Sequence, residues 1–383
     1  MRILILGGDG YLGWPTAMHF ASRGHEVTVV DNYSRRTLAL QTNSQALIPT
    51  PDLATRCDVF SERTGKKIGT EIADCADYRV LSRIVAETRP EAIVHYAEQP
   101  SAPYSMRGYD EARFTLDNNL HTTFNVIWSV MTHARDCHII KLGTMGEYGT
   151  PNIDIEEGYI EICHKGRQDR FLFPRQAGSL YHTTKVLDTD LLWFYVRTYG
   201  LRVTDLMQGP VYGISTPEAD LDERLVPNFH YDDIFGTVLN RFIVQAVAGV
   251  PLTIYGKGGQ TRGYLDLRDT LQCVELAIAN PVERGKLRIL NQFVEQFSVM
   301  QLAERVDSVG KSLGLDVRVQ HVDNPRKELE EHYYNAAHSG FSELGLNPHP
   351  LTDDVLSRMF EQVQKYANLI DRQKILPRVR WKS

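Results

Sequence analysis

The chain has 383 residues, with 42 lysines and arginines against 48 aspartates and glutamates, so its formal net charge is −6. This mildly acidic balance argues against a nucleic-acid-binding or membrane-surface protein. The five cysteines include no Cys-x-x-Cys pair, so no disulfide framework or metal site is indicated, and no apolar run approaches the roughly 20 residues that a membrane helix needs.

The first element is an apolar run, residues 2–6, which is typical of a buried parallel strand. Because it leaves no room for a leader peptide, we expect a cytoplasmic protein. A glycine-rich stretch, 7–13, comes next, followed by a helical pattern over about 14–23, an apolar strand at 26–30, and Asp31. Such glycines permit a tight turn and close approach of a pyrophosphate, which would sit on the helix N-terminus. This order of elements predicts dinucleotide binding.

The acid after the second strand indicates which dinucleotide is bound. Asp31 lies 18 residues after Gly13, about where a carboxylate that accepts the ribose hydroxyls belongs. A carboxylate there favours NAD, because it repels a 2′-phosphate. Arg35 and Arg36 lie just beyond it and could instead hold a phosphate, but NAD is the preferred cofactor.

Residues 38–70 interrupt the alternation of strands and helices. Pro49, Pro51 and a scarcity of periodic apolar positions indicate an inserted segment. Two interpretations stay open for it, a flap over the cofactor and a solvated excursion of the chain.

Strand and helix patterns alternate again after the insertion. The expected strands cover about 68–72, 92–96, 138–142 and 201–207, and the expected helices cover about 78–88, 111–133 and the segment around Tyr181. Repeated units of this kind predict an α/β fold with a Rossmann-type doubly wound parallel sheet. Beyond residue 210 the rhythm loosens. We expect an NAD-binding domain, 1–210, and a smaller substrate-binding lobe, 211–383, with some chain crossing back.

Tyr181 and Lys185 lie four residues apart in a helical pattern, so they share one face of that helix. A phenol has a pKa of about 10, and a fixed ammonium group nearby stabilises the phenolate. The pair can therefore supply a base near neutral pH. The spacing alone is common, and a core tyrosine beside a surface lysine would also explain it. A cofactor that accepts a hydride makes the catalytic interpretation the better one.

These motifs together resemble the extended short-chain dehydrogenase/reductase family. The resemblance covers nearly the whole chain and is carried by the glycine turn, Asp74, Thr144, Tyr181 with Lys185, the run 208–213, and Arg262. Longer runs are similar to one group of that family, the UDP-sulfoquinovose synthases, at 7–11, 101–106, 141–158, 235–237, 256–266 and 330–335. The insertion at 38–70 also fits this group.

The resemblance implies a reaction on UDP-glucose with NAD bound and recycled. Tyr181 would take the proton of the 4-hydroxyl while the hydride leaves carbon 4 for NAD. Thr144 would hydrogen-bond the same oxygen, and Lys185 would hold the tyrosine and the nicotinamide ribose. The ketone acidifies the proton on carbon 5, so water leaves across carbons 5 and 6. Sulfite then adds at carbon 6 and the hydride returns to carbon 4.

The resemblance also implies which residues bind the ligands. Those for NAD are Gly7, Asp9, Gly10, Tyr11, Leu12, Asp31, Asn32, Arg35, Arg36, Asp74, Cys75, Tyr96, Ala97, Glu98, Asn118, Tyr181, Lys185, Gln208 and Val211. Those for the nucleotide sugar are Gln99, Ser101, Thr144, Gln208, Thr237, Asn240, Arg241, Tyr255, Gln260, Arg262, Arg326 and His332. Arg262 and Arg326 would be the cations for the diphosphate, although an exposed salt bridge is the alternative for Arg326. The helices at 111–133 and 181–199 would form a homodimer interface.

The residues after Thr144 leave the acid and base at carbons 5 and 6 open. Sugar 4,6-dehydratases have an aspartate and a glutamate there, whereas this chain has Met145, Gly146 and Glu147, as expected for the synthases. Methionine cannot donate a proton. Glu147 and His182 are therefore the candidate base and acid, and a contact of His182 with substrate or core, without titration, is equally open.

The sulfite step is open for a different reason. The synthases usually have an arginine where this chain has Pro100, and an arginine would hold sulfite by charge and forked hydrogen bonds. Either other groups hold sulfite, or the chain stops before sulfite addition or serves another sugar. A related epimerase or dehydratase without sulfite chemistry is thus the second hypothesis. A non-catalytic NAD-sensing protein is the third, and the intact Thr144, Tyr181 and Lys185 argue against it.

Overall fold

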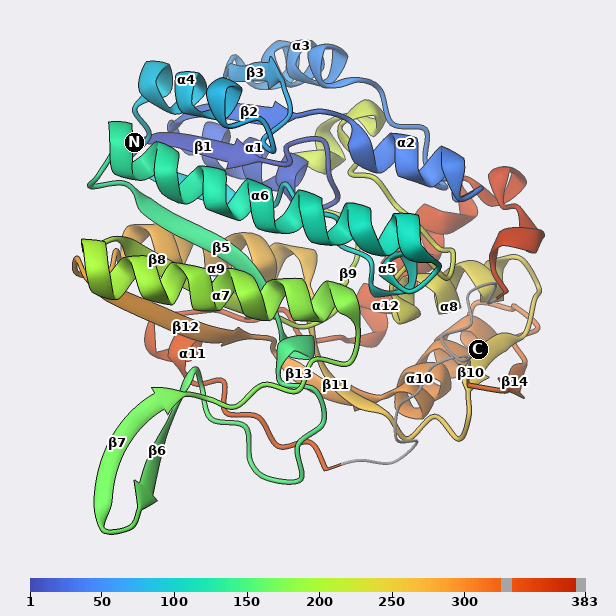
Figure 1. Ribbon diagram of the computed structural model, residues 1–383. Helices are drawn as coiled ribbons and strands as arrows, with labels where there is room; N and C mark the ends of the chain where they lie inside the picture. The colour runs from blue at the N-terminus through green and yellow to red at the C-terminus, as the bar shows by residue number, and fades with distance from the viewer. Residues whose placement is uncertain (325–332, 377–383) are drawn as a thin grey trace.

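The computed structural model describes residues 1–324 and 333–376. Its centre is a seven-stranded parallel sheet with the strand order β12-β8-β5-β4-β1-β2-β3 (Figure 1). In chain order these strands are β1 (Arg2–Leu6), β2 (Glu26–Asp31), β3 (Ile68–Ile72), β4 (Ala92–His95), β5 (His138–Thr144), β8 (Arg202–Gln208) and β12 (Lys286–Gln292). The inner strands are apolar and buried, as parallel strands are when helices cover both faces. The doubly wound parallel sheet predicted from the sequence is confirmed.

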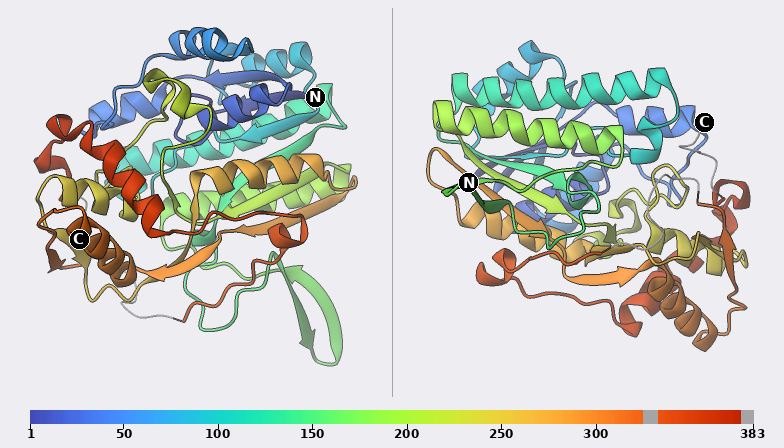
Figure 2. Two further views of the ribbon diagram at one scale, coloured as in Figure 1. Left: turned by 180° about the vertical axis from the view of Figure 1, so that it is seen from behind. Right: turned by 60° about the horizontal axis from the view of Figure 1, so that its bottom comes forward.

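Helices cover both faces of this sheet and each face buries its own hydrophobic core. The face toward the viewer in Figure 1 carries α4 (Tyr78–Thr88), α6 (Tyr109–His133) and α7 (Leu180–Tyr199). The opposite face carries α1 (Gly13–Ser22) and α9 (Leu267–Ala279), seen in the left panel of Figure 2.

A smaller lobe lies at the carboxyl ends of the central strands (Figure 1). Its helices are α8 (Val238–Val247), α10 (Val299–Ser312) and α12 (Asp353–Gln364). Its two small sheets pair β10 (Leu252–Tyr255) with β14 (Val319–Val322), and β11 (Thr261–Asp266) with β9 (Val211–Tyr212) and β13 (Glu295–Ser298). These elements enclose a separate hydrophobic core. Both α9 and β12 come after residue 210. However, β12 is a strand of the seven-stranded sheet and α9 packs on that sheet, so the chain returns from the smaller lobe to the larger one.

Residues 38–70 form neither a flap nor a solvated excursion, because they are folded into the body of the protein. The segment includes the second half of α2 (Ser34–Gln41) and all of α3 (Leu53–Thr64). Phe60 packs into the core on the α1 face, while Leu47 enters the core of the smaller lobe. The insertion therefore connects the two lobes on the side of the glycine turn.

The structure contains a β-hairpin that the sequence analysis did not predict. It consists of β6 (Tyr159–His164) and β7 (Arg167–Leu172), and it projects from the body (Figure 1). Lys165 and Gly166 at its turn have φ values of 50° and 75°, the conformation that two-residue hairpin turns require. The glycine of the Lys-Gly pair favours such a turn, but the second strand has no alternation of apolar and polar residues that would indicate a hairpin. The remaining α-helices are the short α5 (Ala102–Ser105) and α11 (Gly340–Glu343). Within 1–324 and 333–376, no helix has the length and apolar character to cross a membrane.

Candidate active site

The glycine turn after β1 has the shape that a bound diphosphate needs. Gly7 has a φ of 87°, and a Cβ there would lie 2.8 Å from the carbonyl carbon of Tyr96. A Cβ on Gly13 would lie 2.0 Å from the carbonyl oxygen of Gly7. Only glycine fits at these two positions, and α1 begins at Gly13 with its first amides at the turn. The turn thus fits the diphosphate of a dinucleotide.

Asp9 lies in this turn but does not line the cavity described below. Its side chain is 2% exposed and forms ion pairs with Arg36 and with Arg56 from α3. Two guanidinium nitrogens of Arg36 donate to the two carboxylate oxygens at 2.7 Å, and Arg36 also donates to the carbonyl oxygens of Thr50 and Pro51. We call Asp9, Arg36 and Arg56 the turn cluster. The structure thus corrects the expectation for Asp9 and Arg36, since they bind each other and tie the insertion to the turn.

Asp31 closes β2 and lines the cavity. Its two carboxylate oxygens accept hydrogen bonds from the backbone amides of Asp9 (2.9 Å) and Tyr33 (2.7 Å). Burial, and then the charge of Asp9, raises the pKa of Asp31 to about 6. Each oxygen keeps a lone pair, so the group can still accept ribose hydroxyls. Arg35 lines the cavity as well, with its guanidinium 3.7 Å above the centre of the Phe235 ring.

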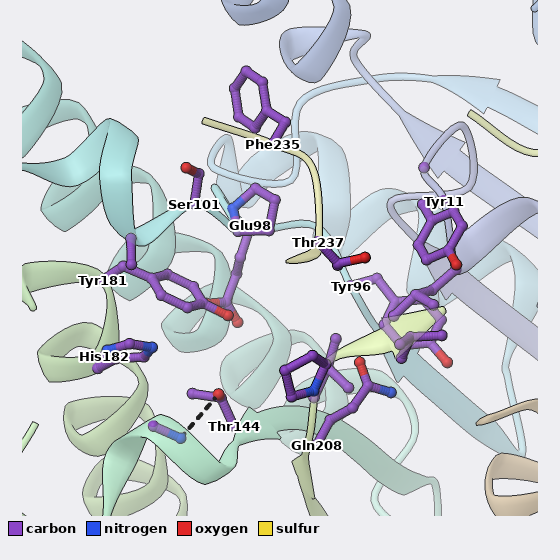
Figure 3. Close-up of a pocket in the computed structure, with 18 of the residues that line it drawn as sticks. Tyr11, Tyr96, Glu98, Ser101, Thr144, Tyr181, His182, Gln208, Phe235 and Thr237 are labelled. Atoms are coloured by element: carbon purple, nitrogen blue, oxygen red, sulfur yellow. Dashed lines mark hydrogen bonds between the residues drawn. The ribbon is translucent and has the colours of Figure 1, made fainter. Parts of the chain in front are cut away.

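A cavity of about 590 Å³ extends from the glycine turn to the smaller lobe (Figure 3). From the set predicted for NAD it is lined by Gly7, Gly10, Tyr11, Leu12, Asp31, Asn32, Arg35, Asp74, Cys75, Tyr96, Ala97, Glu98, Asn118, Tyr181, Gln208 and Val211. From the set predicted for the nucleotide sugar it is lined by Ser101, Thr144, Gln208, Thr237, Asn240, Arg241, Tyr255, Gln260 and Arg262. Arg326 and His332 lie outside the described residues. The two sets, far apart in the sequence, therefore meet at one cavity.

The N-terminus of α7 holds Tyr181 at the cavity wall. Ser179 caps the helix, because its hydroxyl accepts the amide of His182 at 3.2 Å. Ser105, from α5, accepts the amide of Tyr181 at 3.1 Å. The first turn of the helix is thus fixed by two hydroxyls from different elements.

Lys185 lies one turn further along α7, just behind the cavity wall. Its Nζ is 2.6 Å from Oε2 of Glu98 and donates to the carbonyl oxygen of Leu142 at 2.8 Å. Burial raises the pKa of Tyr181, and the negative charges of Glu98 and Glu147 raise it further. Figure 3 shows the carboxyl group of Glu98 pointing toward the hydroxyl of Tyr181. The ammonium group is therefore paired with a carboxylate in this structure.

Thr144 ends β5 at the cavity, and the 3₁₀ turn Met145–Glu147 follows it. The Thr144 hydroxyl accepts the amide of Gly146, and the Glu147 carboxylate accepts the amide of Thr144, each at 3.2 Å. The side chain of Glu147 is fully buried, with Oε1 3.2 Å from Nζ of Lys141, and it does not line the cavity, whereas Met145 does. This is a correction to the expectation that Glu147 is a base, because its carboxylate faces the protein interior and orients Thr144.

His182 keeps its place at the cavity wall. Its Nδ1 lies 3.0 Å from the hydroxyl oxygen of Ser179. A Cβ on Gly146 would lie 2.4 Å from Nε2 of the same ring, so the glycine makes room for the imidazole. Of the two groups that the sequence proposed for carbons 5 and 6, His182 is the one that faces the cavity.

The segment after β4 is braced from within by Gln99, which is 2% exposed and does not line the cavity. Its Nε2 donates to the hydroxyl of Thr115 at 2.8 Å, and its backbone amide donates to Asn119 at 2.8 Å. The expectation of a substrate contact at Gln99 is corrected, because the polar groups of its side chain are used inside the protein. Pro100 and Ser101 beside it do line the cavity.

Two arginines mark the end of the cavity in the smaller lobe. Arg241, on α8, is 6% exposed and donates to the hydroxyl of Tyr255 at 3.0 Å. Arg262 lies on β11, and Gln260 precedes that strand and donates to the carbonyl oxygen of Tyr255 at 3.3 Å. Asn240 accepts the backbone amide of Gly213 at 3.3 Å. This end of the cavity has the cations and amide donors that suit a diphosphate.

The loop 228–236 supplies cavity residues that the sequence analysis missed. Asn228, His230 and Asp233 line the cavity, and the side-chain amide of Asn228 donates to the carbonyl oxygen of Asp9 at 2.8 Å. Burial, followed by the charge of Arg35, lowers the pKa of His230. The loop has no strand or helix periodicity. Its position over the glycine turn follows from packing against distant elements.

Comparison with known proteins identifies the family. The model of the NAD dependent epimerase/dehydratase family matches residues 3–291. The chain belongs to this family. It is 48% identical over 382 residues to "UDP-sulfoquinovose synthase, chloroplastic" from Spinacia oleracea, which covers 100% of this chain and 79% of that protein. It is 44% identical over 386 residues to "UDP-sulfoquinovose synthase" from Sulfolobus acidocaldarius, which covers 100% of this chain and 98% of that one. Within the family it therefore belongs with the UDP-sulfoquinovose synthases.

Solved structures share the fold at lower identity. UDP-glucose 4-epimerase from Thermotoga maritima, solved with UDP-glucose, matches with a TM-score of 0.71 and 20% identity over 95% of this chain and 99% of that one. The epimerase from Bifidobacterium longum, solved with NAD⁺ and UDP, matches with 0.72 and 18% identity over 97% and 100%. The family makes NAD the cofactor, and the glycine turn with Asp31 fits its diphosphate and ribose.

Proposed function

We propose that this enzyme converts UDP-glucose and sulfite to UDP-sulfoquinovose, with NAD bound throughout the cycle. The observation that carries the proposal is the identity along the whole chain to two UDP-sulfoquinovose synthases. The cavity supports it, since Thr144 and Tyr181 line the same space as the glycine turn. A protein that only binds NAD would not need a phenol and a hydroxyl facing the cavity together.

At carbon 4, Tyr181 is the proposed base and Thr144 its partner. Both hydroxyls point into the cavity, where they can bind the 4-oxygen of the sugar (Figure 3). Tyr181 takes the proton of the 4-hydroxyl on oxidation and gives it back on reduction, so this proton balances over one turnover. When bound, NAD accepts the hydride from carbon 4 and later supplies it again.

At carbons 5 and 6, the ketone acidifies the carbon 5 proton and water leaves. The sulfur of sulfite then forms a bond to carbon 6 while carbon 5 takes up a proton. With sulfite as the dianion, UDP-glucose, sulfite and one proton give UDP-sulfoquinovose and water. His182 is the proposed acid–base group for these transfers, because it faces the cavity and Glu147 does not. Arg241 and Arg262 are the proposed cations for the diphosphate.

The test is mass spectrometry of the nucleotide-sugar products after incubation with UDP-glucose, with and without sulfite. We expect a product that carries a sulfonate only when sulfite is present. Sugar turnover that ignores sulfite would instead make the enzyme an epimerase or dehydratase. NAD binding without conversion of any nucleotide sugar would favour a non-catalytic protein.

The second candidate function is that of an epimerase or dehydratase without sulfite addition, and the residue at position 100 favours it. Pro100 lines the cavity, so the position that is usually arginine in the synthases faces the site without a cation. If that position holds sulfite, Pro100→Arg lowers the sulfite concentration needed for half-maximal sulfonation. An unchanged sulfite dependence would mean that other groups of the cavity hold the anion.

A homodimer through α6 and α7 belongs to the same proposal. The two helices pack side by side, and their outer faces expose Phe124, Trp128 and Phe194, each between 38% and 48% exposed. Apolar faces of this kind mark contact surfaces between subunits. Light scattering after gel filtration tests it, with Phe194→Glu expected to give monomers. Phe171→Glu, on the projecting hairpin, is the matched control and should leave the dimer intact. A cytoplasmic location stays a prediction.

A further inference from the structure

Glu98 is placed to govern the catalytic lysine. It follows β4, its side chain is 3% exposed, and it lines the cavity. Its Oε2 lies 2.6 Å from Nζ of Lys185, and its Oε1 lies 3.2 Å from Nε2 of His95. Asp188, one turn beyond Lys185 on the same face of α7, is fully buried and interacts with the carboxyl group of Glu98. We call Glu98, Lys185, Asp188 and His95 the lysine cluster.

The lysine cluster contains one close ion pair and two further groups whose pKa the protein shifts. Burial, and then the charge of Glu98, raises the pKa of Asp188 well above its usual value, which favours the protonated form. Burial lowers the pKa of His95 to about 4, so the imidazole is neutral too. Burial opposes the charge of Glu98, but the charge of Lys185 outweighs it and holds the pKa of Glu98 below its usual value. The close ion pair of the cluster is therefore the one between Glu98 and Lys185.

Lys141 is another buried cation of this region, and it is paired with carboxylates other than Glu98. Nζ of Lys141 lies 3.2 Å from both Glu147 and Asp205, so two carboxylates face it. Lys141 also donates to the carbonyl oxygen of Lys185 at 3.1 Å, which fixes the backbone of α7 at that residue. The charge of Glu98 raises the pKa of Tyr181 and the charge of Lys141 lowers it, so the removal of Glu98 and of its pairing with Lys185 changes the balance of charge at the phenol.

We propose that Glu98 is a positioning residue: it holds the ammonium group of Lys185 away from full engagement with Tyr181, and so controls how readily the phenol loses its proton. An ammonium beside a phenol favours the phenolate, whereas a carboxylate disfavours it. Glu98 opposes the phenolate in both ways, because it is itself negative and because it neutralises the lysine. The inference rests on the proposed function, in which Tyr181 is the base at carbon 4.

The first test is the pH dependence of carbon 4 oxidation. The NAD-loaded protein is mixed with UDP-glucose without sulfite, and NADH absorbance is followed in a single turnover from about pH 5 to 10. Glu98→Gln should shift the acidic limb of the rate profile downward by about 1–3 pH units, since it removes a negative charge that raises the pKa of Tyr181. Glu98→Asp, which keeps the charge, should restore the limb toward that of the unmodified enzyme.

A control separates the charge of Glu98 from a general effect of losing a carboxylate. Glu91→Gln, at the opposite end of β4 and on the surface, should leave the limb unchanged. A limb that stays in place in Glu98→Gln, or a rate reduced by the same factor at every pH, would overturn the inference and leave Glu98 a structural residue.

A second measurement does not need turnover. The protein carries carbon-13 at Cζ of its tyrosines, and the signal missing from Tyr181→Phe assigns Tyr181. The NMR titration midpoint of that signal should lie lower in Glu98→Gln than in the unmodified protein. An equal or higher midpoint contradicts the inference. Because the titration is independent of the substrate, a failure of sulfonation would overturn the proposed function and leave this result standing.

Discussion

Two buried ionic clusters flank the cavity, and they differ in what their members can do. The turn cluster joins one carboxylate, Asp9, to two guanidinium groups. Guanidinium groups keep their proton in proteins, so the two positive charges of the turn cluster do not change with pH in the working range. The lysine cluster consists of carboxyl, imidazole and ammonium groups beside a phenol, all of which exchange protons.

The difference shows how one physical device serves two purposes. A charge pair taken out of water must be well matched, or it costs several kcal/mol. Where the cations are guanidinium groups, which keep their proton, such a pair fixes the backbone, as Arg36 and Arg56 fix the glycine turn through Asp9. Where the pair lies beside a phenol, it adjusts the proton affinity of that phenol, as Glu98 does through Lys185. We therefore expect variants of the turn cluster to change stability, and variants around the lysine cluster to change rate and pH dependence.

The largest effect is expected at the phenol that the lysine cluster serves. Tyr181→Phe should reduce turnover by about 10²–10⁴-fold, because it removes the proposed base while keeping the ring. NAD and UDP-glucose binding, measured by calorimetry, should be retained. Loss of NAD binding instead would assign the tyrosine a structural role.

Next in size is a break in the turn cluster. Arg56→Leu leaves the buried Asp9 with one partner fewer and should lower the free energy of unfolding by about 3–5 kcal/mol, read from urea denaturation. The single-turnover rate of the folded fraction should be unchanged. Arg63→Leu removes from the same helix an ion pair whose arginine is half-exposed and whose carboxylate, Asp222, keeps Arg224 as a partner, so it should cost less than about 1 kcal/mol. Equal losses for the two variants would contradict the distinction between buried and exposed pairs on α3.

A smaller effect, with a definite sign, is expected at Asp31. Its folded pKa of about 6 lies above the ordinary value of 3.8, so folding favours its protonated form. That stabilisation is fully present below about pH 4 and is lost as pH rises through 6. Asp31→Asn mimics the neutral acid. Without cofactor, it should therefore gain up to about 2 kcal/mol relative to the unmodified protein between pH 4 and 7. Parallel stability curves for the two proteins would show that the acid is ionised throughout.

The smallest effect is expected at the edge of the turn cluster. Asn228→Ala removes the hydrogen bond to the carbonyl oxygen of Asp9 and should cost about 1–2 kcal/mol of stability. A modest loss of NAD affinity should accompany it, because the backbone of the turn becomes less fixed. Calorimetry with NAD measures this, and a loss of the hydride step at saturating NAD would place Asn228 in the chemistry instead.

Much of the site followed from local rules that operate within one or two elements. A strand that runs into glycines and a helix needs φ values and close approaches that Gly7 and Gly13 alone permit. Asp31 at the end of the next strand, and Tyr181 and Lys185 on one helical face, are consequences of strand and helix geometry. Such features depend on the spacing of residues along a helix or strand and on the backbone angles that each residue type prefers. Both can be judged from the sequence.

The chain by itself determined the parallel sheet, the nucleotide-binding turn and the tyrosine–lysine pair. The tertiary structure decided the direction of the charged side chains. Glu147, three residues after Thr144, turns inward to Lys141, while Glu98, just after β4, reaches Lys185. It also decided that residues 38–70 brace the glycine turn through Arg56. The reason is that a buried charge goes where an opposite charge can meet it, and the partners here come together only when distant elements pack.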